Sequence, residues 1–416
     1  MASMDIVGGV PLKGTVYASG AKNALLPILA ASVMLDGETN LKNAPYLGDV
    51  NIMLRMLTSL GIRAEHLPND CIHIVNQKKV RHIAPYDLVT AMRASFFVAG
   101  PLLAKTGFAK VPMPGGCSIG TRPIDIHLQG FEALGAEINI EHGFVQLKTK
   151  EIRGTKFKLP FPSVGATENL MMAACLGRGT TVFENTACEP EIVDLANFLN
   201  AAGAKITGAG SPTISVEGVS SLRGISLYSV IPDRIEVGTF MIAAAITSGD
   251  IVIKNACYDH VSLLGEKLKL MGVDVEHDID SIRVSSKGRL KAIDFDTEPY
   301  PGFPTDMQSQ MMTLLSISEG KSKIKESIFE NRYMHVPELK RMGADIKVDK
   351  EYAFIKGVES LSAAEVRSTD LRASASMVLA GLVAKGRSKV HGLKHLRRGY
   401  HNLAEKLIGL GAEIYQ

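Results

Sequence analysis

One pattern of apolar and polar positions recurs six times along the chain. An apolar, helix-like run ends at a glycine, and alternating apolar and polar residues follow that glycine. The six glycines are Gly61, Gly135, Gly203, Gly272, Gly343 and Gly411. Neighbouring copies lie roughly 70 residues apart, as expected of a repeated supersecondary unit. Each glycine stands where a helix ends in a left-handed residue, and the alternation after it predicts a strand.

A second, almost uniformly apolar run lies about 40 residues before each glycine, in the same repeating order. The six runs are NALLPILAA, SFFVAGPLL, NLMMAACLG, TFMIAAAIT, QMMTLLSIS and SMVLAGLVA. A helix that is apolar on all sides is usually buried, so we expect these helices at the centre of the fold. Strands such as GTTVFENTA separate the two helices. The pattern therefore predicts an α/β protein with six helix–strand–helix–strand–strand units. We group them as two domains of three, although repetition alone does not decide the grouping.

Length and charge narrow the class of protein. A chain of 416 residues is too long for one ordinary core, so two or three domains are expected. A net charge of +3 without long basic blocks argues against binding to nucleic acid or to an anionic membrane. The longest apolar run, NALLPILAASVML, is shorter than the ~20 residues of a membrane span. MASMDIVGG lacks the pattern of an export signal, so we expect a cytoplasmic protein.

The cysteines and the absent motifs exclude several kinds of chemistry. Five scattered cysteines without a metal-ligand spacing indicate reduced thiols rather than disulfides or a metal site. For Cys71, Cys175, Cys188 and Cys257 we expect buried apolar packing. His127 and His395 are interpreted as packing or polar contacts, not as ligands. A dinucleotide fingerprint, a Walker A loop and a GxSxG elbow are all missing from the sequence, which argues against a nicotinamide dehydrogenase, an ATPase and a serine hydrolase.

The segment 111–127, VPMPGGCSIGTRPIDIH, interrupts the repeat with a glycine- and proline-marked loop. Cys117 lies in this loop. The apolar run that follows Arg122 predicts a helix whose first residue is Pro123. A helix N-terminus attracts anions and lowers the pKa of a nearby thiol. The loop therefore suggests a reactive thiol beside an anion site, with a buried structural cysteine as the alternative.

Charged residues gather near the starts of the predicted helices. The basic residues that begin or precede a helix are Lys22, Arg93, Arg122, Arg332, Arg372 and Arg398. Converging arginines would bind a substrate with more than one anionic group. Asp306, in FPTDMQSQM, also lies at a helix start. It reads either as an N-cap, which the local sequence favours, or as a general base. Asp370 has the same two readings, as does Asp233, whose neighbour Arg234 suggests a surface pair.

These residues lie in segments that resemble one family along the whole chain. The matching segments are SGAKNALLPIL (19–29), MRAS (92–95), PGGCSIGTRPIDIH (114–127), SVGATENLMMAA (163–174), EPEIVDLANFL (189–199), PDRIEVGTF (232–240), FPTDMQSQ (303–310), FENRYMHVPEL (329–339), TDLRASAS (369–376) and RGYHNLAEKL (398–407). The chain resembles the enolpyruvyl transferases that act on UDP-N-acetylglucosamine. The resemblance implies a two-domain inside-out α/β barrel. Its domains would be 22–231, with the Cys117 loop, and 1–21 plus 232–416, with the active site in the cleft between them.

The resemblance also implies the reaction and the roles of the residues. The family transfers the enolpyruvyl group of phosphoenolpyruvate to the 3-hydroxyl of UDP-N-acetylglucosamine by addition and loss of phosphate, the first committed step of peptidoglycan synthesis. Cys117 would donate a proton and react with the family's epoxide antibiotic, fosfomycin, and Asp306 would accept the hydroxyl proton. The positions implied for phosphoenolpyruvate are Lys22, Asn23, Arg122, Arg332, Arg372 and Arg398, with Lys22 and Arg398 also counted as catalytic. Those implied for the nucleotide sugar are Asn23, Arg93, Arg122, Pro123, Ile124, Asp125, Ile126, Ser163, Val164, Asp306 and Ile328. No cofactor, metal or obligate protein partner is expected.

Two positions depart from the family pattern, and two other functions compete with this interpretation. Phe161 stands where some relatives carry a lysine, and Arg397 where many carry an aspartate. We expect the two changes to bear on affinity or pH dependence, not on the reaction class. One rival is the enolpyruvyl transferase that acts on shikimate 3-phosphate, which shares the repeat but lacks the cysteine loop. The other is a non-catalytic paralogue that only binds the nucleotide sugar.

Overall fold

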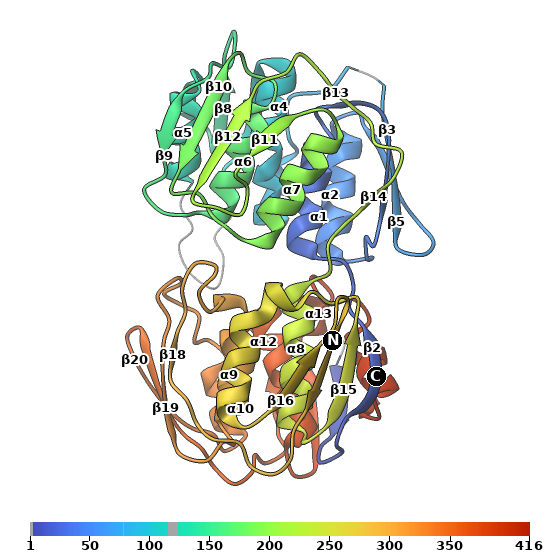
Figure 1. Ribbon diagram of the computed structural model, residues 1–416, viewed down its shortest axis with the longest axis vertical. Helices are drawn as coiled ribbons and strands as arrows, with labels where there is room; N and C mark the ends of the chain where they lie inside the picture. Colours follow the sequence, from blue (N-terminus) through green and yellow to red (C-terminus); the bar gives the residue numbers. More distant parts are fainter. Residues whose placement is uncertain (1–2, 78, 115–123) are drawn as a thin grey trace. The chain divides into compact units, whose positions relative to one another are not determined.

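The computed structural model describes residues 3–77, 79–114 and 124–416. The described chain forms two compact units (Figure 1). One consists of residues 20–114 and 124–231, and we call it the 20–231 unit. The other consists of residues 232–416 together with the N-terminal residues up to Ser19, and we call it the 232–416 unit. Within the described residues, no helix is both long and apolar enough to cross a membrane.

The 20–231 unit contains three copies of the predicted repeat. The first copy is α1 (Lys22–Ala31), β3 (Leu35–Lys42), α2 (Gly48–Ser59), β4 (Arg63–Leu67) and β5 (Cys71–Asn76). The second is α3 (Tyr86–Ala91), η1 (Arg93–Val98), α4 (Ala99–Thr106), β6 (Phe108–Pro112), α5 (Asp125–Ala133), β7 (Glu137–Glu141) and β8 (Phe144–Lys148). The third is β9 (Lys156–Lys158), α6 (Val164–Ala174), β10 (Thr180–Glu184), α7 (Pro190–Ala201), β11 (Lys205–Thr207) and β12 (Thr213–Glu217), followed by β13 (Leu222–Arg223) and β14 (Tyr228–Ser229).

The 232–416 unit contains the other three copies. The fourth is α8 (Arg234–Ile246), β15 (Asp250–Lys254), η2 (Tyr258–Val261), α9 (Ser262–Met271), β16 (Asp274–His277) and β17 (Ser281–Ser285). The fifth is β18 (Phe295–Asp296), η3 (Thr305–Met307), α10 (Gln308–Leu315), β19 (Lys321–Lys325), α11 (Val336–Arg341), β20 (Asp345–Asp349) and β21 (Tyr352–Lys356). The sixth is β22 (Glu365–Arg367), α12 (Leu371–Val383), β23 (Arg387–His391), α13 (Leu393–Leu396), α14 (Leu403–Gly409) and β24 (Glu413–Tyr415).

Each of the first five repeats builds one small sheet in which its three strands are antiparallel, which confirms the predicted helix–strand–helix–strand–strand order there. The sixth sheet takes its missing strand from the start of the chain. Strand β1 (Ser3–Val7) lies between β23 and β24, with Ser3 opposite His391 and Asp5 opposite Tyr415. Five of the sheets also gain a parallel edge strand, which the sequence pattern did not predict. In the fourth sheet this edge is β2 (Lys13–Tyr17), in register with β15.

The apolar helices lie inside and the sheets outside, as the sequence predicted. Every residue of α8 from Ile235 to Ile246 is buried, and α6 is buried from Ala166 to Ala174. In the 232–416 unit α8, α10 and α12 contact one another, and Figure 1 shows them between the sheet of β15 and the sheet of β19. In the 20–231 unit α6 contacts both α1 and α4. These helices are apolar all round because each is surrounded by other helices and by sheet.

The six repeating glycines adopt the left-handed conformation that their position predicted. Their φ values are 93° at Gly61, 91° at Gly135, 105° at Gly203, 100° at Gly272, 94° at Gly343 and 99° at Gly411. At the last four, an added Cβ would meet no atom within 4 Å. Glycine is therefore required there by the backbone conformation and not by lack of space.

A second repeated feature was missed by the sequence analysis. Asn43, Asn185 and Asn255 follow the first strand of their repeats and have positive φ values of 55°, 56° and 53°. Their side-chain Nδ2 atoms donate, each over 2.8 Å, to the carbonyl oxygens of Val230, Leu159 and Ala18. Each asparagine thereby ties the end of its strand to the segment that precedes a central helix. The recurring Asn-Ala or Asn-Thr pair was the available signal.

Candidate functional site

Asp306 joins two buried arginines in the 232–416 unit. Its Oδ1 accepts a hydrogen bond from Arg332 Nη2 at 2.6 Å, and its Oδ2 accepts one from Arg372 Nη2 at 2.7 Å. The arginine side chains are 3% and 4% exposed, whereas the Asp306 side chain is 28% exposed. Asp306 lies in η3, whose N-cap is Pro304 and has no side-chain cap bond. The N-cap interpretation of Asp306 is therefore wrong, because its carboxylate is used by the two guanidinium groups.

The N-cap interpretation is correct for Asp370 and Asp233. The Asp370 carboxylate accepts from the backbone N–H groups of Arg372 at 2.8 Å and Ala373 at 3.1 Å. This cap fixes the first turn of α12, which carries Arg372 as its second residue. Asp233 accepts in the same way from the N–H of Ile235 and caps α8. Asp233 is buried and does not lie at the surface.

The groups around Arg372 keep its guanidinium protonated. Burial acts to lower its pKa, but the electrostatic interactions with Asp306, Tyr400 and Asp233 and the hydrogen bond to Asp306 outweigh burial, and the pKa rises above its usual value. The guanidinium lies 5.6 Å from the centre of the Tyr400 ring. Its Nη1 atom is buried and has no hydrogen-bond partner among the described residues. A buried donor without a partner is costly, so this edge of Arg372 suits an additional anion.

Glu326, which the sequence analysis missed, organises the backbone around Asp306. It is 4% exposed and accepts hydrogen bonds from Thr305 Oγ1 and Thr297 Oγ1, each at 2.9 Å. Its Oε1 also accepts from the N–H of Ile328 at 3.0 Å. Burial raises the pKa of Glu326, and the hydrogen bonds and the charge of Arg332 partly offset that rise. One carboxyl group thus positions the neighbour of Asp306 and the candidate residue Ile328.

Helix starts in the 20–231 unit carry most of the other candidates. Lys22 is the first residue of α1, and its Nζ lies 3.3 Å from Asp49 Oδ2 in the first turn of α2. Both side chains are largely buried, at 11% and 4% exposure. Asn23 follows in α1, and Arg93 begins η1. A lysine at a helix start is disfavoured by the helix dipole, so Asp49 supplies compensating charge.

The remaining candidates of the 20–231 unit lie at two further helix starts. Ser163 caps α6, its Oγ accepting from the N–H of Ala166 at 3.4 Å, and Val164 is the first residue of that helix. Ile124 is the N-cap residue of α5. Asp125 and Ile126 form its first turn. The sequence thus placed its candidates at helix N-termini, where free N–H groups can bind anions.

His127 is a packing histidine, as the sequence suggested. It is 9% exposed, its ring packs edge-on against Phe96, and Nδ1 lies 3.3 Å from the Asn169 amide nitrogen. Burial, and secondarily the charge of Arg93, lower the pKa of His127 to about 3. His127 is therefore neutral near pH 7.

Several predicted positions lie elsewhere. Cys117, Arg122 and Pro123 lie outside the described residues. Arg398 is half-buried between α13 and α14. The two departures from the family pattern, Phe161 and Arg397, are exposed.

The expectation of buried packing holds for one of the other four cysteines. Cys175 is buried, and burial raises the pKa of its thiol to about 12. Cys71, Cys188 and Cys257 are only partly buried, because they lie at strand and loop positions near the surface.

Four carboxyl groups gather near the start of α7, a feature that the sequence analysis did not single out. Glu168, on α6, is buried and has no hydrogen-bond partner among the described residues for either oxygen. Burial, followed by the charges of Glu191 and Glu189, raises its pKa well above the usual value. Asp194 accepts a hydrogen bond from Tyr228 Oη at 2.7 Å. Burial raises the pKa of Asp194 to about 6, although its hydrogen bonds act in the opposite direction.

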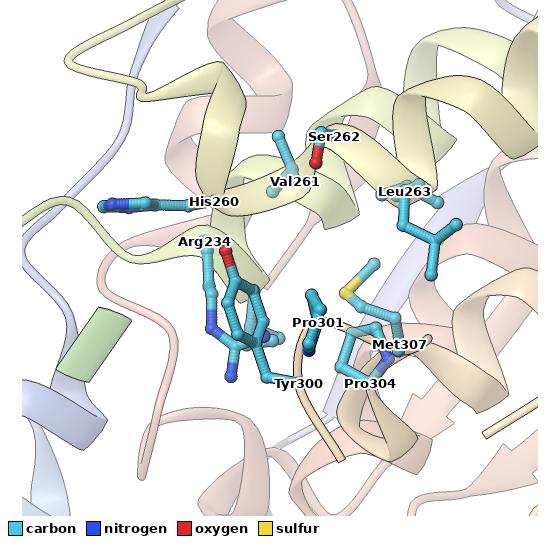
Figure 2. A pocket seen from close by; sticks show the side chains of 12 residues that line it. Arg234, His260, Val261, Ser262, Leu263, Tyr300, Pro301, Pro304 and Met307 are labelled. Carbon is cyan, nitrogen blue, oxygen red and sulfur yellow. The ribbon is translucent and has the colours of Figure 1, made fainter. Parts of the chain in front are cut away.

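A pocket adjoins the short helix that carries Asp306. Pro304 and Met307 line it, together with residues of α8, η2 and the start of α9. Figure 2 shows Arg234 beside Tyr300 in this pocket, and the Arg234 guanidinium lies 5.6 Å from the Tyr300 ring centre. The residues that line the pocket include none of the positions expected to bind substrate.

Comparison with known proteins agrees with the sequence resemblance. Residues 6–407 match the family described as EPSP synthase (3-phosphoshikimate 1-carboxyvinyltransferase). A protein of Caldanaerobacter subterraneus subsp. tengcongensis named UDP-N-acetylglucosamine 1-carboxyvinyltransferase 1 is 54% identical over 407 residues, covering 98% of this chain and 97% of the relative. The UDP-N-acetylglucosamine 1-carboxyvinyltransferase of Halothermothrix orenii is 49% identical, covering 100% of this chain and 99% of its own.

Solved structures share the fold. The enolpyruvyl transferase NikO from Streptomyces tendae has a TM-score of 0.88 at 25% identity, covering 99% of this chain and 98% of its own. An EPSP synthase from Acinetobacter baumannii has a TM-score of 0.76 at 21% identity and covers 100% of both chains, a likeness that concerns the fold. With its family match over residues 6–407 and relatives about half identical over nearly their whole length, the chain belongs to the EPSP synthase family of enolpyruvyl transferases, among members named UDP-N-acetylglucosamine 1-carboxyvinyltransferase.

Proposed function

We propose that this chain transfers the enolpyruvyl group of phosphoenolpyruvate to the 3-hydroxyl of UDP-N-acetylglucosamine. The observation that carries the proposal is the pair of buried guanidinium groups, Arg332 and Arg372, on one carboxylate, Asp306. It occurs in a chain whose relatives carry the corresponding name over nearly their full length. Two fixed, desolvated arginines provide the bidentate donors that a carboxylate substrate requires.

The proposed reaction has an addition and an elimination step. In the addition, the sugar hydroxyl oxygen bonds to carbon 2 of phosphoenolpyruvate while carbon 3 takes up a proton. In the elimination, carbon 3 loses a proton and the bond from carbon 2 to the phosphate oxygen breaks. Asp306 would accept the hydroxyl proton, and Cys117 would deliver the proton to carbon 3.

The basic residues would stabilise the anionic groups through both steps. We assign the phosphate to Lys22, Arg122 and Arg398, and the carboxylate to Arg332 and Arg372. Fixed cations of this kind contribute most where charge grows or moves in the transition state.

The remaining positions would hold the nucleotide sugar. They are Asn23, which would also contact phosphoenolpyruvate, and Arg93, Arg122–Ile126, Ser163, Val164, Asp306 and Ile328. The starts of α5 and α6 supply free N–H groups, which suit a diphosphate. We further propose that the protein acts in the cytoplasm without a metal or obligate protein partner.

A phosphate-release assay tests the function. The purified protein is incubated with phosphoenolpyruvate and either UDP-N-acetylglucosamine or shikimate 3-phosphate, and inorganic phosphate is measured. We expect release only with the nucleotide sugar. Release only with shikimate 3-phosphate would assign the other activity of the family. Nucleotide-sugar binding without release would indicate a non-catalytic paralogue.

A further inference from the structure

The contacts of Asp306 suggest that this residue does more than accept a proton. Each of its oxygens is bound by a different guanidinium, at 2.6 and 2.7 Å. A bound substrate carboxylate would make the same arrangement with the same two donors. In this structure the side chain of Asp306 therefore occupies the position that a carboxylate ligand would need.

The three side chains differ in how firmly they are held. Arg332 and Arg372 are almost fully buried, and Arg332 Nε also donates to the carbonyl oxygen of Thr305 at 3.3 Å. Arg372 is fixed by the capped first turn of α12. The Asp306 side chain is 28% exposed, and Asp306 is not the N-cap residue of η3. Asp306 is thus the partner that can move, while the arginines form a fixed receptor.

The charge of the two arginines favours replacement of the Asp306 carboxylate by a ligand carboxylate over its departure without replacement. Two buried guanidiniums require an anion, because an uncompensated buried charge is strongly unfavourable. Arg372 Nη1 remains without a partner among the described residues even with Asp306 in place. An incoming carboxylate can replace Asp306 and keep each guanidinium bound to one carboxylate oxygen.

The exchange would also control reactivity. A carboxylate that accepts hydrogen bonds from cations on both oxygens is held in its charged form and is a weaker proton acceptor. Once displaced, the same carboxylate would be available to the sugar hydroxyl. We propose that Asp306 is the resident counter-ion of the Arg332–Arg372 pair, and that a substrate carboxylate displaces it and thereby releases it as the base. This inference rests on the function proposed above.

Binding of a small carboxylate to a variant tests the exchange. Pyruvate, which has the carboxylate but no phosphate, is titrated calorimetrically into the wild type and into Asp306→Asn. If Asp306 competes for the arginines, the variant binds pyruvate more tightly, by about tenfold or more. Equal or weaker binding would overturn the proposal. It is the result expected if Asp306 only holds Arg332 and Arg372 in place, because the two arginines would then be disordered in Asp306→Asn.

Asp250→Asn is the matched control. It removes one negative charge and one aspartate–arginine pair from the same unit, since Asp250 is bound to Arg283 at 2.9 and 3.0 Å on the surface. Its pyruvate affinity should equal that of the wild type. An equal gain in both variants would mean that net charge, not competition at the arginines, causes the effect.

A second measurement does not depend on the variant folding. Crystal structures of the wild type are determined with and without phosphoenolpyruvate. When the substrate carboxylate is bound, the Asp306 carboxylate should no longer be hydrogen-bonded to at least one of the two guanidinium groups. Both contacts persisting in the complex would overturn the exchange. Phosphate release by the wild type is scored separately. Its absence with UDP-N-acetylglucosamine would refute the proposed function, while tighter pyruvate binding by Asp306→Asn would still establish competition at the arginines.

Discussion

Thr305 is bound to Glu326: its hydroxyl donates to the buried Glu326 carboxyl at 2.9 Å, and Thr305 immediately precedes Asp306. The same carboxyl accepts from the backbone N–H of Ile328. Two candidate substrate positions, in η3 and in the segment after β19, therefore depend on the carboxyl group of Glu326. This relationship makes Glu326 a positioning residue for Asp306.

We expect Glu326→Ala to lose hydrogen bonds to two hydroxyls and two backbone N–H groups. The free energy of unfolding should fall by about 2–4 kcal/mol, because buried donors lose their acceptor. Activity should fall as well, since the backbone of η3 is no longer fixed. Urea unfolding and kcat/KM for phosphate release measure the two effects.

Glu326→Gln is the control for this variant. Its amide oxygen can keep the backbone bonds, and Thr305 can accept from its amide nitrogen. We expect it to restore most of both the stability and kcat/KM. If glutamine is as damaging as alanine in kcat/KM while stability recovers, the charge of Glu326, and not its hydrogen bonds, supports the site.

Thiol reactivity should distinguish Cys117 from the other cysteines. The epoxide fosfomycin should attach to Cys117, and Cys117→Ala should abolish turnover with little change in calorimetric binding of the nucleotide sugar. Cys175 should stay unmodified, because burial raises its pKa to about 12 and the thiolate is the reactive form. Peptide mapping of the labelled protein locates the adduct. A label on Cys71, Cys188 or Cys257 would contradict the assignment, as would loss of sugar binding in the alanine variant.

The repeat glycines offer a test of the fold. Gly272→Ala places a Cβ on a residue with φ of 100°, where nothing crowds it. The strain is confined to the backbone, so we expect a loss of about 1 kcal/mol of unfolding free energy. Gly409→Ala, also uncrowded but at the end of α14 without a positive φ, should be neutral or slightly stabilising. Equal effects of the two variants in urea unfolding would exclude the left-handed conformation as the cause.

The repeated architecture was predictable because its signals are local. The uniformly apolar helix from Ile235 to Ile246 and the glycine that ends α9 act through their own neighbours in the sequence. The position of β1 between β23 and β24 was not predictable from pattern, because that pairing joins residues nearly 400 positions apart. Edge strands as short as β18 (Phe295–Asp296) have too few residues to show an alternation of apolar and polar positions.

The candidate site divides in the same way. Residue type and helix starts identified Lys22, Arg332, Arg372 and Asp306 as candidates, but local sequence favoured an N-cap for Asp306. The ion pairs that overrule this reading join residues 26 and 66 positions apart. Glu326 was overlooked because it lies at the end of a strand in an ordinary charged sequence, KSKIKES. Its four hydrogen bonds arise only when three segments meet.

Asp194 should make the stability of the protein depend on pH in an unusual direction. Burial raises its pKa from 3.8 to about 6, so the folded state favours the protonated carboxyl. Its contribution is fully present below about pH 4 and is lost as the pH rises through about 6. A shift of this size corresponds to at most about 3 kcal/mol. Asp194→Asn stays neutral, and its amide can still bond to the Tyr228 hydroxyl and the Ile231 N–H. We therefore expect the free energy of unfolding of Asp194→Asn, relative to that of the wild type, to be higher at pH 7.5 than at pH 4.

Urea unfolding across this pH range, with Asp250→Asn as the comparison, decides the matter. Hydrogen bonding to Arg283 lowers the pKa of Asp250, so its contribution is present above about pH 4 and is lost on acidification. Replacing Asp250 should therefore change the stability curve at low pH and leave the region from pH 4 to 6 intact. Replacing Asp194 should flatten that region. If Asp194→Asn keeps the full wild-type slope between pH 4 and 6, the protonated carboxyl of the folded state must belong to another group, and Glu168, buried without a partner among the described residues, is the next to replace.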